Sequence, residues 1–351
     1  MPRRPLIALG VVLLVLVAGA VTYALGIGPL APPTAARSVV FVAISRSNDE
    51  ADAREIEAID LTAGTRDLFD AGGRITAMAL SADRRSIYVA LDGGKIVLLD
   101  ATTGSQFGAL DLGGPRVISL VPTVDGHTLF AVAVTNVQSA VVPIDLSTKK
   151  AGDSITFPLT AGPAVLRDDS LVVPLADNQR LEVAFVDVNT HAVRSRLTLP
   201  LRGSLVAPTA FGKDGGRTGI VAFDGGFGGG DALLRMYVLT DPAHWSEAAG
   251  LQAAPFPREP GLRPVGIGLQ AAVAQDGTVH LCAIVGTAAR RYVVGPDLKG
   301  TSAGTDCGPL SGGDLILMAK RDPAQLLVLD ERSGRVIRTL PLAGVPARLA
   351  Q

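Results

Sequence analysis

The clearest sign of structure in this chain is the stretch Ser-Ile-Tyr-Val-Ala-Leu-Asp-Gly-Gly-Lys-Ile-Val-Leu-Leu-Asp-Ala-Thr-Thr-Gly at residues 86–104. Two apolar runs, 87–91 and 96–99, flank a Gly-Gly turn, and the second run closes on Asp100. Short runs rich in Val, Ile and Leu between Gly and Asp turns are typical of antiparallel strands. Together with the apolar runs at 75–80 and 107–112, they predict a unit of four strands over residues 74–113.

The turn at Asp100 recurs along the chain. Apolar runs closed by Asp end at Asp60, Asp100, Asp145, Asp187 and Asp330, with Thr240-Asp241 as a degenerate copy and room for one more near 293–297. A turn Asp can accept backbone N–H groups two residues on, so we interpret it as structural. Seven copies over residues 38–351 are about 45 residues each, the length of a four-stranded propeller blade.

The two ends of this region complement each other. Residues 39–45 match the second strand of a unit, and residues 343–351 match the start of an innermost strand. Pairing residues 345–350 beside 39–43 would remove an open sheet edge. The sequence therefore predicts an all-β fold, a seven-bladed β-propeller of four-stranded blades closed by shared N- and C-terminal strands.

Residues 86–104 resemble the YVTN repeat of YncE-like β-propellers, with Tyr88-Val89-Ala90 in the signature place. The resemblance covers this unit well and all seven units loosely. It implies a seven-bladed fold typical of exported and surface proteins, but a fold shared by many functions implies no activity. Quinoprotein dehydrogenases also carry Asp-x-x-Thr-Gly turns, closed by a tryptophan in each blade. This chain has one tryptophan, Trp245, so we expect no such cofactor.

The N-terminus predicts a membrane anchor. Residues 6–28 carry no charge, and as a helix they would be about 34 Å long, enough to cross a hydrocarbon core of about 30 Å. Arg3 and Arg4 precede this run, which predicts a cytoplasmic stub at 1–5, a linker at 29–37 and an extracytoplasmic propeller at 38–351. The alternative is a secretory signal peptide cleaved after Ala18-Gly19-Ala20. Either alternative exports the protein.

Charge and cysteine content limit the partners. Lys plus Arg number 32 and Asp plus Glu 33, so no global positive field favours nucleic acid. The two cysteines, Cys282 and Cys307, are 25 residues apart in the exported part. We expect a disulfide between them, with two buried free thiols as the alternative.

Several motifs suggest chemistry but lack what the chemistry needs. Gly300-Thr-Ser302-Ala-Gly304 fits a nucleophile elbow, yet no helical pattern follows, so we expect an interblade loop. The four histidines have no metal-ligand spacing, and the glycine run at 224–231 has no Lys-Ser/Thr to hold a phosphate. Asp49, Glu50 and Asp52 form an acidic hairpin loop that could attract a cation such as Ca²⁺ or be merely solvated.

Three arginines form the candidate ligand site. Arg74 and Arg116 fall in register at the entry to innermost strands, and Arg348 lies within a residue of the same place in the closing unit. Innermost strands surround the central channel, so these guanidinium groups could meet at one mouth and bind an anion. The alternative is that each is solvated and paired with a neighbouring Asp.

No convincing set of acid, base, nucleophile or metal ligands emerges, and we expect no cofactor. The sequence therefore favours an exported, membrane-anchored, non-catalytic scaffold that binds a protein partner or a small anionic ligand, such as a subunit of an envelope complex. The alternative is a lactonase-like hydrolase with charged residues of several blades at the channel mouth.

Overall fold

The computed structural model describes residues 38–47, 49–135, 138–177, 179–200, 205–212, 216–224, 233–251, 267–285, 288–312 and 315–350. The propeller lies in a compact unit, Ala36–Gln351. The predicted stub, anchor and linker (1–37) lie outside the described residues. Within the described ranges, no helix is long and apolar enough to cross a membrane.

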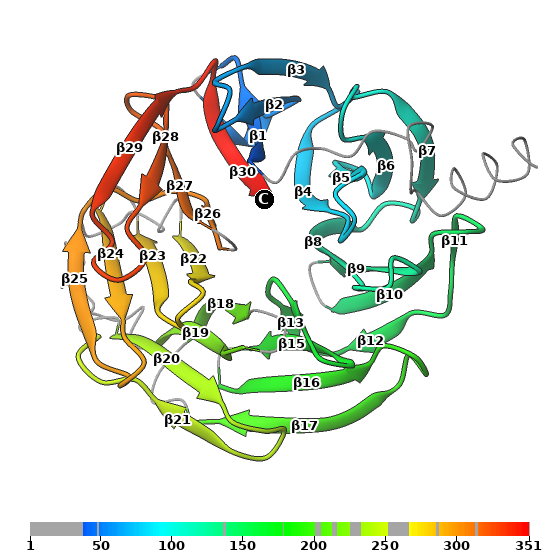
Figure 1. The fold of residues 1–351 in the computed structure, drawn as a ribbon. Helices are drawn as coiled ribbons and strands as arrows, with labels where there is room; N and C mark the ends of the chain where they lie inside the picture. Colours follow the sequence, from blue (N-terminus) through cyan, green and yellow to red (C-terminus); the bar gives the residue numbers. More distant parts are fainter. Residues whose placement is uncertain are drawn as a thin grey trace, which may run out of the picture. The chain divides into compact units, whose positions relative to one another are not determined.

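Seven antiparallel sheets form a ring, which confirms the predicted propeller (Figure 1). Blade 1 contains β30(Val345–Ala350), β1(Val39–Ser45), β2(Glu55–Asp60) and β3(Arg66–Asp70), with the short 3-10 helix η1(Glu50–Asp52) between β1 and β2. Blade 2 contains β4(Ile75–Leu80), β5(Ser86–Leu91), β6(Lys95–Asp100) and β7(Gln106–Asp111). Blade 3 contains β8(Arg116–Pro122), β9(Thr128–Val134), β10(Ser139–Asp145) and an outer strand in two pieces, β11(Lys150–Ala151) and β12(Ile155–Phe157).

Blades 4 to 7 complete the ring. Blade 4 has an inner strand in two pieces, β13(Thr160–Ala161) and β14(Val165–Arg167), then β15(Ser170–Ala176), β16(Leu181–Asp187) and β17(Val193–Leu199). Blade 5 contains β18(Leu205–Gly212), β19(Thr218–Asp224), β20(Leu233–Leu239) and β21(Trp245–Glu247). Blade 6 contains β22(Ile267–Val273), β23(Val279–Val285), β24(Ala288–Val294) and β25(Gly300–Gly304). Blade 7 contains β26(Leu310–Ser311), β27(Ile316–Lys320), β28(Gln325–Leu329) and β29(Val336–Pro341).

The ring closes where the sequence predicts. β30 pairs with β1 in the register Phe41↔Ala350 to Ser45↔Val345. The buried carboxylate of Glu57 on β2 reinforces this closure, because it accepts the backbone N–H of Ala343 (2.8 Å) just before β30. The last strand of the chain is thus the innermost strand of blade 1.

The recurring Asp residues hold the turns between the third and fourth strands. Asp60 accepts the N–H groups of Thr62 (2.7 Å) and Ala63 (2.9 Å), and equivalent bonds recur at Asp100, Asp145, Asp187, Asp241 and Asp330. The expected seventh copy is the turn at Asp297, which accepts the N–H of Lys299 (3.2 Å). The predicted structural role of this Asp is therefore correct.

The core lies between blades. One buried cluster joins Tyr88, Ile96 and Leu98 of blade 2 to Leu129 and Ile144 of blade 3, and similar clusters join other neighbouring blades. Each sheet therefore buries its apolar faces against the next sheet, and the space inside the ring is left to the side chains of the innermost strands.

Candidate functional site

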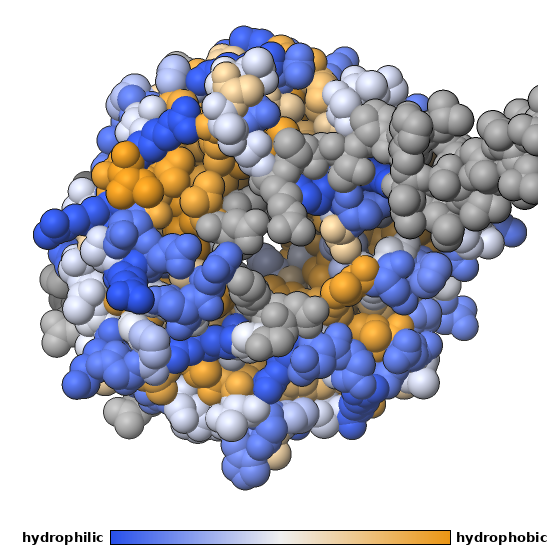
Figure 2. Space-filling model, viewed as in Figure 1, coloured by the Kyte–Doolittle hydropathy of each residue, from blue (hydrophilic) through white to orange (hydrophobic). Residues whose placement is uncertain are grey.

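A cavity of about 690 Å³ lies inside the ring, lined by residues of innermost strands and the turns beside them. The innermost strands that contribute are β4, β8, β13, β18, β22 and β30, and the ends of the second strands β9(Thr128–Val134) and β15(Ser170–Ala176) add Val134 and Ala176. Figure 2 shows the corresponding hollow at the centre of one face. Because this space collects residues from most of the blades, it is where the fold brings distant parts of the sequence together.

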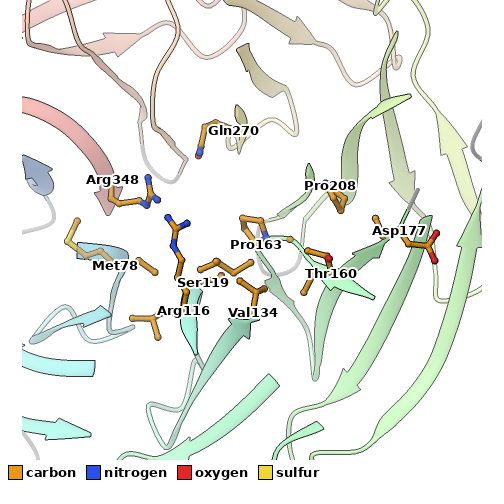
Figure 3. Close-up of a pocket in the computed structure, with 16 residues that line it drawn as sticks. Met78, Arg116, Ser119, Val134, Thr160, Pro163, Asp177, Pro208, Gln270 and Arg348 are labelled. Atoms are coloured by element: carbon orange, nitrogen blue, oxygen red, sulfur yellow. The ribbon is translucent and has the colours of Figure 1, made fainter. Parts of the chain in front are cut away.

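Two of the three predicted arginines meet in this cavity. Arg116 comes from the start of β8 and Arg348 from β30, and Figure 3 shows their guanidinium groups pointing toward one another. Arg348 is partly buried; its Nε donates to the carbonyl of Thr76 (3.0 Å) and its Nη1 to that of Ala347 (2.7 Å). Within the described ranges, neither arginine forms an ion pair with a carboxylate.

The positive charges of Arg116 and Arg348 repel each other. Burial, and then the positive charge of Arg116, lower the pKa of Arg348. A guanidinium remains protonated in proteins, so the two like charges face the same cavity. An anion placed between them would relieve this repulsion and find donors that suit bidentate hydrogen bonding.

Arg74 does not join this pair. Its Nε donates to the carbonyl of Ala51 (3.0 Å), and its Nη1 lies 3.5 Å from Asp92 on the surface. Arg74 is not among the residues that line the cavity. For this residue the structure shows the surface alternative, a solvated arginine beside an Asp.

The sequence pattern places Arg348 within one residue of the strand position of Arg116, but β-bulges show that the two positions differ by more. The innermost strands β30, β4 and β8 each have one unpaired residue, and Arg348, Ala77 and Ser119 are the residues that follow it. Arg348 is therefore equivalent to Ser119, three positions further along the strand than Arg116. The long side chains still let Arg116 and Arg348 share one cavity.

The side chain of the residue after the bulge also forms a hydrogen bond to the neighbouring blade. In blade 1 it is Arg348, which donates to Thr76 of blade 2. In blade 5 the equivalent Thr209 donates to the carbonyl of Leu269 in blade 6 (3.2 Å). Arg348 thus contributes to ring closure as well as to the charge of the cavity.

The rest of the cavity wall contains apolar side chains together with the polar residues Ser119, Thr160 and Asp177. Gly162 and Pro163 interrupt the inner strand of blade 4 and line the cavity beside Val134 and Pro208. Gln270 of β22 points toward the arginine pair (Figure 3). No motif in the sequence marked Gln270, because it lies in a blade without a matching arginine.

In the acidic loop of blade 1, Asp49, Glu50 and Asp52 each contact a different partner. Asp49 caps η1 by accepting the N–H of Ala51 (2.9 Å). Glu50 forms an ion pair with Arg321 of blade 7, and Asp52 accepts from Arg54 (2.9 Å). The described residues contain no cluster of three His, Cys, Asp or Glu side chains able to hold a metal. The cation-binding role of Asp49, Glu50 and Asp52 stays a prediction.

The other motifs take structural positions. Ser302 lies on β25, an outer strand and not the expected loop, so it has no strand-to-helix elbow. His280 lies on β23, where it is fully buried, and its Nε2 lies 2.6 Å from the carbonyl of Glu331. Burial lowers the pKa of His280. The glycine loop at 225–230 lies outside the described residues.

Cys282 and Cys307 form a disulfide in this structure, with Cα atoms 5.4 Å apart. Cys282 is buried on β23, and Cys307 lies in the connection from β25 to β26. This separation is within the usual range for a disulfide. The bond links blade 6 to the segment that enters blade 7.

Comparisons with known proteins support the fold. No family model matches the chain, and no curated protein matches it in sequence. A functionally unknown protein from Desulfotomaculum acetoxidans DSM 771 is similar in structure, with a TM-score of 0.62 at 12% identity, over 89% of this chain and 97% of that chain. The RRP9 WD40 repeats give 0.56 at 13% identity over 79% and 83%.

Enzymes also occur among the similar structures. The dihydro-heme d1 dehydrogenase NirN has a TM-score of 0.56 at 14% identity, over 89% of this chain and 65% of that chain. At such identities the similarity shows the propeller fold alone. The likeness to YncE-like propellers thus remains a resemblance.

Proposed function

We propose that this protein is an exported, membrane-anchored propeller that acts as a non-catalytic binding scaffold and takes up an anionic group in its central channel. The observation that carries this proposal is the pair Arg116 and Arg348, which face one cavity without a carboxylate partner in the described ranges. The anionic group can belong to a small molecule or to a protein partner. The WD40 repeats among the similar structures agree with a scaffold of this kind.

Anion binding can be tested with simple probes on the full chain in detergent. Inorganic phosphate and acetate, at constant ionic strength, should raise the melting temperature by binding only the folded state. Arg116→Gln should remove the effect, whereas Arg74→Gln should keep it, because Arg74 is outside the cavity. Equal stabilisation of both variants would contradict the proposal.

The rival function is a lactonase-like hydrolase in the same channel. The titratable residues that line the cavity are Arg116, Arg348 and Asp177. Asp177 is already held by the N–H of Gln179 (2.8 Å) and the guanidinium of Arg180 (2.8 Å), which leaves it poorly placed as a general base. Turnover of lactones or esters that is lost in Arg116→Gln would favour the enzyme instead.

The anchor has its own test. The apolar run at 6–28 supports a segment that stays attached, and carbonate washing of membranes should leave the protein in the pellet. A soluble form that begins near Val21 would show that the segment is a cleaved signal peptide.

A further inference from the structure

The charge of the cavity calls for a ligand with two negative charges. Arg116 and Arg348 bring two positive charges, and the only acid among the lining residues is Asp177, which Arg180 neutralises. A single carboxylate would leave one of the two guanidinium charges uncompensated. A phosphate monoester carries about 1.5 to 2 negative charges at pH 7 and compensates nearly both.

The donors also come from three directions. Arg116 projects from β8, Arg348 from β30 and Gln270 from β22, and all three line the same cavity (Figure 3). A carboxylate has two oxygens in one plane. A phosphate monoester presents three terminal oxygens in a tetrahedral arrangement, which suits donors that come from three directions better than the planar carboxylate does.

The rest of the cavity suits an uncharged organic body. Met78, Ile118, Val134, Pro163 and Pro208 line it, with the hydroxyl residues Ser119 and Thr160 beside them. The volume of about 690 Å³ is within the range of small-molecule sites and far exceeds the need of a bare phosphate. The ligand should therefore have an apolar part that removes these side chains from water.

We infer that the channel ligand is an organic phosphate monoester with an apolar body, held at the phosphate by Arg116, Arg348 and Gln270. This inference rests on the proposed function, since it names the chemical class of the anion in the same cavity. The phosphate replaces the missing counter-charge of the arginine pair, and the body lies against Met78 and Pro163.

Three probes measure separately how much the phosphate group and the apolar part of the ligand contribute to affinity. Isothermal titration calorimetry on the full chain in detergent should rank phenyl phosphate first, because it has both parts. Benzoate keeps the ring but has one charge, and inorganic phosphate keeps the head group but has no ring. We expect each to bind about tenfold or more weakly than phenyl phosphate.

Variants assign the contacts. Arg116→Gln should weaken phenyl phosphate about 10- to 100-fold, as expected for loss of a charge-assisted hydrogen bond. Gln270→Ala should weaken phenyl phosphate about fivefold and leave benzoate unchanged, since only the phosphate has an oxygen left for the amide. Arg74→Gln is the matched control and should bind all three probes as the wild type does.

The pH dependence gives an independent readout. The titratable groups that face the site are Arg116, Arg348 and Asp177. Hydrogen bonds from Gln179 and Arg180 hold the pKa of Asp177 below its ordinary value, so this carboxyl stays ionised above pH 5. The second pKa of a phosphate monoester is about 6, so the affinity for phenyl phosphate should rise from pH 5 to pH 7.5. Benzoate binding should stay nearly constant over this range.

The outcomes distinguish the two proposals. If benzoate binds as tightly as phenyl phosphate and Arg116→Gln weakens both, the ligand class is wrong and the anion-binding channel stands. If neither probe depends on Arg116, both are wrong. If Gln270→Ala weakens benzoate and phenyl phosphate equally, the three-donor head group is overturned.

Discussion

Glu57 should be a main determinant of ring closure. Its side chain is almost fully buried on β2; Oε1 accepts from Nη1 of Arg66 (2.9 Å), and Oε2 accepts the N–H of Ala343 (2.8 Å). One carboxylate thus joins the β2–β3 hairpin of blade 1 to the backbone that leads into β30. Glu57→Ala removes both contacts and leaves the N–H of Ala343 without this acceptor.

The magnitude follows from these two contacts. A hydrogen bond to a charged group is worth about 1.5 to 3 kcal/mol, and two such bonds are lost. Ala343 is an exposed residue, so water can satisfy its N–H once the carboxylate is gone, and the low end of this range applies. The side chain of Arg66 is 32% exposed, so water recovers part of the lost ion pair. We expect Glu57→Ala to lower the free energy of unfolding by about 3 kcal/mol and Glu57→Gln, which keeps an acceptor, by about 1 kcal/mol.

Urea unfolding of the full chain in detergent measures this effect, with Glu55→Ala as the control. Glu55 lies on the same strand and also pairs with an arginine, Arg46, but both side chains are more exposed (29% and 55%), so its loss should cost about 1 kcal/mol or less. Hydrogen exchange of residues 343–350 should speed up in Glu57→Ala before exchange of the other blades does. Equal destabilisation by Glu55→Ala and Glu57→Ala would refute this account of the closure.

Three further predictions follow from other residues. Gly162→Ala should destabilise the fold by roughly 2 kcal/mol or more in urea unfolding, because a Cβ would lie 1.7 Å from a backbone oxygen of β18; Gly268→Ala, with its nearest atom at 3.8 Å, should be nearly neutral. Without reductant, the denatured chain should show no reactive thiol, because Cys282 and Cys307 are bonded; two labelled thiols per chain would contradict this. Hydrogen bonds, first from the Ser hydroxyl two residues on, lower the pKa of Asp145 to about 2, so the stability it contributes is present above about pH 4 and lost as the pH falls toward 2. Asp145→Asn should therefore flatten the decrease in stability between pH 4 and pH 2, and an unchanged decrease would show that this turn does not contribute to it.

The number of blades and their turns could be predicted from the sequence because both depend on local chemistry. An Asp at the end of an apolar strand accepts the N–H groups of the next residues whichever blade it is in, as at Asp60 and Asp187. The spacing of these turns predicts the blade length. The complementary ends of the region predict the pairing of β30 with β1. Each of these features involves residues close in sequence or an unpaired sheet edge.

The candidate site depends on the tertiary structure. Arg74 and Arg116 have the same local context, but a neighbouring Asp92 pairs with the first, and the second faces the cavity. The acidic loop that suggested a cation is partly neutralised by Arg321, which is distant in the sequence. Local pattern cannot show which charges are compensated, because the compensating side chains arrive from other blades.

The residues that line the channel show most clearly that the site depends on the tertiary structure. Residues 116, 270 and 348 belong to three different blades, and no spacing between them marks a motif. A bulge in each of β30, β4 and β8 sets how far along the strand each side chain enters the channel. Most strand pairs join neighbours in the sequence, and sequence patterns record them. The convergence of innermost strands arises only when the ring closes, and Arg116, Gln270 and Arg348 share one cavity for that reason.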